Sequence, residues 1–139
     1  MRVSLFAAVA VALVCASTAL AGGWATVKLS SSPKGTSADE PWVVDITVLQ
    51  HGLASQPLCC VKPTVTIRRI GPLRAPSAAA KPKPLTFKAR PTSRVGVYRA
   101  RVVFPTAGKW TYEVYDGFTE YGGARTHAFK PVKITPGGV

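Results

Sequence analysis

Residue types that build catalytic and metal sites are scarce in this chain. It contains 6 acidic residues against 18 basic ones, 2 histidines, 3 cysteines and one methionine, which is the initiator. No acidic residue occurs between Asp45 and Glu113. The chain therefore has no evident pair of carboxylates for general acid–base catalysis. It also lacks the G-x-S-x-G turn of hydrolases and the G-x-x-x-x-G-K-[ST] phosphate loop, so we expect no enzyme activity.

Long apolar runs are also lacking, apart from one at the start of the chain. That stretch, MRVSLFAAVAVALVCASTALAGG, has one basic residue, an apolar run and a small-residue ending. The run is shorter than the roughly 20 residues that span a bilayer, which argues against a retained membrane anchor. The pattern predicts a secretory signal peptide, residues 1–21, cleaved after Ala21. We expect residues 22–139 to form one domain without a transmembrane helix, secreted or extracytoplasmic and associated with the cell surface.

The shortage of acids leaves a formal net charge of +12. Such a field favours anionic partners, either cell-wall polymers or acidic lipid headgroups, and the predicted export argues against nucleic acid. The acid-free segment GPLRAPSAAAKPKP, residues 71–84, is predicted to be an extended surface loop. The basic residues in and around it form our predicted contact with an anionic surface: Arg68, Arg69, Arg74, Lys81 and Lys83. The alternative is that the charge only keeps the protein soluble and the loop is a plain linker.

Apolar and polar residues alternate with a period of two through the rest of the chain. The alternating segments are WATVKLS, WVVDITVLQ, VKPTVTIRR, LTFKAR, VYRARVVF, WTYEVYD and THAFKPVKI. In the last of them the apolar phase changes, so Pro131 is expected to mark a bulge or a sheet edge. Short strands separated by turn signals such as FPTAG and YGG predict an all-β fold. We expect an immunoglobulin-like antiparallel β-sandwich of about seven strands, with a small barrel as the alternative.

One loop segment, QHGLASQPLCCVKP, combines a histidine with two adjacent cysteines. Imidazole and thiolate together suit Cu(I) or Zn(II). A hairpin in this segment would bring His51 opposite the cysteines, with a second histidine from a distant strand. The predicted metal ligands are therefore His51, Cys59, Cys60 and His127, with Cu(I) preferred to Zn(II). Because successive side chains of a strand point to opposite faces, the two thiols can act together only in a turn.

Two other interpretations of the cysteine pair stay open. The first is a vicinal disulfide between Cys59 and Cys60, favoured by an oxidising location. Neighbouring Cα atoms are about 3.8 Å apart, which is below the usual range for a disulfide, so that ring would be strained and easily reduced. The second is purely structural, with one cysteine in the core or in an intermolecular bridge and His51 ending a strand before Gly52.

Three stretches taken in order resemble a known family: GGWATVKLS, PWVVDITVLQHG and GVYRARVVFPTAGKWTYEVYDG. They resemble the YtkA-like family of exported bacterial immunoglobulin-like domains, whose layout is similar to FixH-type and CopC-type copper-handling domains. The resemblance covers nearly all of residues 22–139 and implies a fold and an envelope location, without a settled activity. It carries over six residues as a His-Gly feature and as corner and core positions: His51, Gly52, Gly96, Tyr98, Gly108 and Trp110. The cysteine pair is not part of the family pattern. GGWATVKLS also lacks the His and Met ligands of CopC-type proteins.

We therefore predict an exported, non-catalytic binding or accessory module of the bacterial cell envelope. Its expected partner is an envelope protein of unknown identity or an anionic cell-wall polymer, and we expect no nucleic acid. One alternative function is extracytoplasmic copper handling through His51, Cys59 and Cys60. The other is adhesion to an anionic envelope polymer through the basic central region. No cofactor is expected apart from the Cu(I) or Zn(II) of the metal hypothesis.

Overall fold

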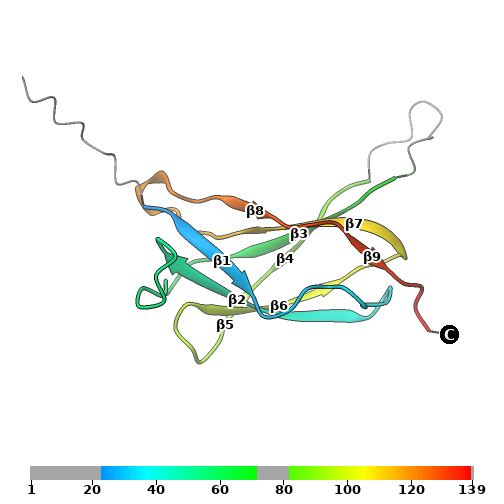
Figure 1. Ribbon diagram of the computed structural model, residues 1–139, viewed down its shortest axis with the longest axis horizontal. Coiled ribbons are helices and arrows are strands. Elements are labelled where there is room, and N and C mark those ends of the chain that lie inside the picture. Colours follow the sequence, from blue (N-terminus) through cyan, green and yellow to red (C-terminus); the bar gives the residue numbers. More distant parts are fainter. Residues whose placement is uncertain (1–22, 72–81, 139) are drawn as a thin grey trace, which may run out of the picture.

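A computed structural model describes residues 23–71 and 82–138 of the chain. This part is all-β, with two antiparallel sheets, nine strands and no α-helix (Figure 1). The predicted signal peptide, residues 1–21, lies outside the described residues, as does most of the predicted loop at 71–84. Within the described residues, no helix is long and apolar enough to cross a membrane.

The nine strands form a four-stranded and a five-stranded sheet. In chain order the strands are β1 (Ala25–Leu29), β2 (Pro41–Gln50), β3 (Thr64–Arg69), β4 (Leu85–Lys88), β5 (Arg90–Pro91), β6 (Val97–Val103), β7 (Gly108–Tyr115), β8 (Thr126–Ala128) and β9 (Val132–Ile134). The first sheet has the order β1-β2-β6-β5, and the second has the order β4-β3-β7-β8 with β9 also paired to β7. A short 3-10 helix, Glu120–Gly122, lies between β7 and β8.

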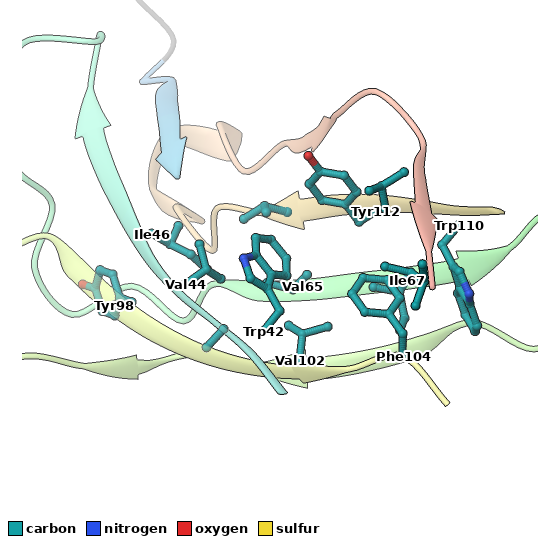
Figure 2. Close-up of a cluster of buried hydrophobic side chains, with 14 of the residues drawn as sticks. Trp42, Val44, Ile46, Val65, Ile67, Tyr98, Val102, Phe104, Trp110 and Tyr112 are labelled. Carbon is teal, nitrogen blue, oxygen red and sulfur yellow. The ribbon is translucent and has the colours of Figure 1, made fainter. Parts of the chain in front are cut away.

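The core lies between the two sheets, as the alternating pattern predicts. The inward residues of the four central strands are all buried: Trp42, Val44, Ile46 and Val48 of β2, Val65 and Ile67 of β3, Tyr98, Ala100 and Val102 of β6, and Trp110, Tyr112 and Val114 of β7. Figure 2 shows Tyr98 at one end of this cluster and Trp110 at the other. Each of the larger apolar side chains contributes about 1.5–3 kcal/mol through its burial, so the packing of these four strands determines the sandwich.

The number of strands differs from the prediction because two predicted segments are divided. LTFKAR forms two strands, since β4 pairs with β3 while β5 pairs with β6, and the chain changes sheets at Ala89. The alternation in LTFKAR places Leu85 on the inward face with Phe87, but Leu85 is 38% exposed because β4 is an edge strand. The last segment is divided near Pro131. Before it, β8 pairs with the end of β7, and after it, β9 pairs with the beginning of β7. The expected change of register at this proline is confirmed.

Candidate functional site

Six basic side chains line one groove of about 1510 Å³ on the surface. The groove lies where the chain passes from β4 in the second sheet to β5 in the first. No acidic residue occurs among the described residues that line it. We call it the basic groove, and its basic residues are Lys62, Lys88, Arg90, Arg94, Arg99 and Arg101.

The strand pattern explains why three of these guanidinium groups gather. On β6 the buried residues alternate with exposed Arg99 and Arg101, so both arginines lie on the outer face of the first sheet. Arg90 of the edge strand β5 pairs in register with Arg99 and lies on the same face. Like charges on neighbouring strands repel each other. The arrangement therefore needs either a counter-charge from the protein or an anionic ligand.

Asp45 of β2 supplies the one counter-charge that contacts the groove within the described residues. Its Oδ1 accepts a hydrogen bond from Arg99 Nε at 2.7 Å, and its Oδ2 accepts one from Arg99 Nη2 at 3.0 Å. Arg94 Nη2 contacts the same Oδ2 at 3.4 Å. The hydrogen bonding to Arg99 is the main cause that holds the pKa of Asp45 below its ordinary value. Arg99 is thus neutralised within the protein.

The other basic residues of the groove lack such a partner. In the described part of the chain, the ion pairs of lysine and arginine are those of Asp45 with Arg94 and Arg99, and the other acidic contact joins Asp116 to His127. Four groove residues therefore present their charge to solvent without an acidic partner among residues 23–71 and 82–138: Lys62, Lys88, Arg90 and Arg101.

The structure gathers a different basic set from the one predicted. Arg68 and Arg69 lie exposed at the end of β3, and Lys83 is exposed before β4, but none of the three lines the basic groove. Arg74 and Lys81 lie outside the described residues. The outward phase of the β6 arginines was visible in the sequence. Their position beside the residues of β4 and β5 was not, because it depends on the change of sheet between those strands.

The cysteine pair lies in the loop between β2 and β3. Both thiols are free and exposed. The Cys60 Sγ donates a hydrogen bond to the Cys59 Sγ over 2.9 Å. The backbone of Cys60 has a φ of 66°, in the left-handed region. This turn conformation accounts for the two successive thiols lying together, whereas an extended strand would place them on opposite faces.

Tyr98 of β6 fixes the turn that carries the cysteines. Its buried hydroxyl donates a hydrogen bond to the Leu58 carbonyl oxygen at 2.8 Å and accepts one from the Val61 N–H at 3.2 Å. The hydroxyl thereby joins the two residues that flank the cysteine pair. Burial raises the pKa of Tyr98, which keeps the hydroxyl protonated. A bond from the Leu58 N–H to the Val48 carbonyl oxygen, 3.0 Å long, ties the same turn to β2.

The four predicted metal ligands do not come together. His51 follows the last residue of β2 with a φ of 51°, and its ring centroid lies 5.4 Å from that of Trp24. His127 lies in β8, and its Nε2 is 2.9 Å from an Asp116 carboxylate oxygen. The described residues contain no group of three or more His, Cys, Asp or Glu side chains able to hold a metal ion. Only the two thiols of the predicted set are adjacent.

Asp116 is a buried polar residue that sequence reasoning missed. Its side chain is fully buried and accepts hydrogen bonds from the backbone N–H groups of Phe118, at 2.9 Å, and Arg125, at 3.2 Å. With the contact to His127, it joins the loop after β7 to the beginning of β8. The only signal in the sequence was its position before Gly117, in the turn-forming YDG. We interpret Asp116 as structural.

Comparison with known proteins supplies no family for this chain. No protein-family model matches it, and no curated protein matches it either. The resemblance to the YtkA-like family therefore stays a prediction. The function has to be inferred from the basic groove and the cysteine turn themselves.

Proposed function

We propose that this chain is an exported, non-catalytic binding module that holds an anionic polymer of the bacterial cell envelope in the basic groove. The observation that carries the proposal is that the charged side chains lining the groove are all positive. Six basic side chains face one groove, and its described lining contains no acidic residue. A folded surface that concentrates one sign of charge attracts ligands of the other sign and raises their local concentration.

The type of basic residue favours carboxylate or phosphate groups. Four of the six groove cations are arginines, whose planar guanidinium forms two parallel hydrogen bonds to such groups. The cations come from the residues before β3, from β4, β5, the following turn and β6, so they are spread along the groove and do not converge on one point. Phe87 and Pro91 add apolar surface between them. This distribution suits a ligand with repeated negative charges better than a single small anion.

The immunoglobulin-like character of the sandwich is part of the proposal. The orders β1-β2-β6-β5 and β4-β3-β7-β8 correspond to the A-B-E-D and C′-C-F-G sheets of such domains. At the beginning of β7, Trp110 Nε1 donates a hydrogen bond to the Thr106 carbonyl oxygen at 2.9 Å. Trp110 lies at the turn from β6 to β7, the position of the tyrosine corner in immunoglobulin-like domains. In that corner an aromatic side chain forms a hydrogen bond to the backbone a few residues upstream. Both features support this fold type.

Export is proposed from residues 1–21 and has its own test. The protein should be recovered from the envelope or the medium of its host, with Gly22 as the first residue. Terminal sequencing and the intact mass of the recovered protein measure this directly. Recovery of the uncleaved chain from the cytosol would reject an envelope function.

Binding to immobilised poly-L-glutamate and to polyphosphate tests the groove. The variant Lys88→Gln, Arg90→Gln, Arg101→Gln removes three groove charges without disturbing the pair between Asp45 and Arg99. Exposed charge contacts contribute about 0.2–1 kcal/mol each. The triple variant should therefore bind about threefold to a hundredfold more weakly than the wild type. Binding by the wild type should also weaken as salt is added.

A matched control variant separates the groove from the net charge. Arg68→Gln, Lys109→Gln and Lys133→Gln remove the same charge from exposed positions outside the basic groove. This control should retain nearly all of the affinity. An equal loss in both variants would show that only net charge matters. A wild-type protein that binds neither polymer would reject the proposed function.

A further inference from the structure

The turn at Cys59 and Cys60 meets the two requirements of thiol–disulfide exchange, which are access and proximity. Both thiols are exposed, so another sulfur can approach them. Their Sγ atoms lie 2.9 Å apart, so a disulfide formed at one can be attacked by the other with little movement. Exchange proceeds through a mixed disulfide that a second thiol resolves. The basic groove and its ligand play no part in this site.

The hydrogen bond between the thiols assigns them different roles. The Cys60 S–H donates to the Cys59 Sγ at 2.9 Å, so the proton of Cys60 is engaged and the S–H of Cys59 is not the donor in this bond. Hydrogen bonding with Cys59 is the main cause that raises the pKa of Cys60. Cys60 therefore ionises less readily than an ordinary thiol. Because the thiolate is the attacking species in exchange, Cys59 is suited to open a disulfide and Cys60 to complete the reaction.

We propose that Cys59 and Cys60 form a redox pair that exchanges a disulfide with a partner and cycles between a dithiol and an easily reduced vicinal disulfide. The Cys59 thiolate attacks one sulfur of the partner disulfide, a Cys59–partner bond forms, and the other partner sulfur leaves as a thiolate that takes up a proton. Cys60 then loses its proton and attacks the Cys59 sulfur, which releases the second partner thiol. The protein loses two electrons and two protons, and the partner gains them. Reduced glutathione returns the ring to the dithiol by the reverse steps.

Tyr98 is a positioning residue for the second step. Its hydroxyl holds the residues on both sides of the cysteine pair, so it limits the conformations in which the two sulfurs separate. Without the hydroxyl, the two hydrogen bonds from Tyr98 to Leu58 and Val61 are lost, and this side chain no longer connects the two ends of the turn. The first attack needs only an exposed Cys59, whereas ring closure needs both sulfurs together. Loss of the hydroxyl should therefore slow the second step and leave the first nearly unchanged.

The experiment uses the full chain with Cys15→Ser, so that only the pair can react. The reduced protein is incubated with glutathione disulfide, quenched with N-ethylmaleimide at a series of times, and measured by intact mass. The expected product has lost two hydrogen atoms, carries no maleimide and no glutathione, and returns to the dithiol with reduced glutathione. Stable glutathione adducts or disulfide-linked dimers, without ring closure, would overturn the proposal.

A single variant and the wild type test the order of the two steps in the same background. Cys60→Ser should stop at a mixed disulfide on Cys59, formed at nearly the rate at which the wild type consumes glutathione disulfide. In the wild type, the mixed disulfide trapped by an early quench should lie on Cys59, and fragmentation of the peptide that contains both cysteines locates it. A mixed disulfide that forms first on Cys60 would overturn the assigned roles.

Tyr98→Phe and Tyr112→Phe form a matched pair for the positioning role. Each removes one hydroxyl from a core tyrosine, but Tyr112 belongs to β7 of the second sheet. Tyr98→Phe should accumulate the mixed disulfide on the way to the ring, and Tyr112→Phe should not. Circular dichroism confirms that both variants are folded at the temperature used. The same amount of mixed disulfide in both would show that Tyr98 acts only through stability.

Discussion

At the scale of single residues, Asp45 is the side chain that reduces the electrostatic repulsion among the arginines of the basic groove. It holds Arg99 through two hydrogen bonds, of 2.7 and 3.0 Å, in the fork geometry that guanidinium and carboxylate share. Arg99 is thereby kept against the sheet. Because the hydrogen bonding lowers the pKa of Asp45 in the folded protein, the charged form of this residue stabilises the fold. The carboxylate thus sets both the local charge of the groove and a pH dependence.

The variant Asp45→Asn tests this pH dependence. At neutral pH we expect it to lower the free energy of unfolding by less than about 1 kcal/mol, because exposed ion pairs contribute little. The folded pKa lies below the unfolded value of about 3.9. The contribution is therefore fully present above the unfolded value and is lost as the pH falls through the folded one. Urea unfolding across this pH range should show the wild type and the variant converging in acid, and a difference independent of pH would contradict the assignment.

At the scale of elements, the turn between β5 and β6 comes very close to the loop that carries the cysteines. Gly96 has a φ of 75°, and a Cβ at this position would lie 2.6 Å from the Cβ of Pro57. Its carbonyl oxygen accepts a hydrogen bond of 2.8 Å from the Val48 N–H. Both the backbone conformation and the space therefore require glycine here. Gly35 also has a positive φ, of 87°, but a Cβ added there would meet no atom within 4 Å.

These two glycines provide a matched pair of substitutions. Gly35→Ala should cost about 1–2 kcal/mol, from the left-handed backbone alone. Gly96→Ala should cost about 1–3 kcal/mol more, because the neighbouring loop has to move as well. The midpoints of urea unfolding measure both values. Equal costs would mean that the loop before the cysteines yields freely and is not held by this turn.

Alternation predicted the central elements well and the edges poorly. The inward residues of β2, β3, β6 and β7 are buried as expected, because each of these strands has neighbours on both sides and a core on one face. The inward position predicted for Leu85 is wrong, because an edge strand such as β4 is incompletely covered. The change of register predicted at Pro131 is confirmed, because proline has no N–H group and cannot continue a regular ladder of backbone hydrogen bonds in any surroundings.

At the scale of the whole molecule, the charge is strongly unbalanced. The chain carries a formal net charge of +12, and in the described residues Asp45 is the only acidic residue that contacts a lysine or arginine as an ion pair. Uncompensated like charges repel each other and destabilise the compact state. Within the basic groove this repulsion is concentrated. A polyanion that binds there would relieve it, so binding and stability are expected to rise together.

Added salt should therefore raise the melting temperature. Screening at about 0.1 M ionic strength shortens the range of repulsion to roughly 10 Å, and we expect an increase of a few degrees between low and moderate concentrations of sodium chloride. The variant Lys88→Gln, Arg90→Gln, Arg101→Gln should melt at a higher temperature than the wild type at low salt and should respond less to added salt. Scanning calorimetry measures both. A melting temperature that falls as the first salt is added would show that attraction outweighs repulsion.

The sequence by itself determined where the central strands lie and which of their faces is buried. Those properties are local, because the direction of a side chain alternates along any strand. It also showed that the cysteines could cooperate only in a turn. Tertiary structure alone decided that the turn exists, through the positive φ of Cys60 and the hydroxyl of Tyr98. Tertiary structure alone also brought Arg90 beside Arg99. Contacts between residues that are distant in sequence depend on how the strands pair, and the pattern within a single strand does not determine that pairing.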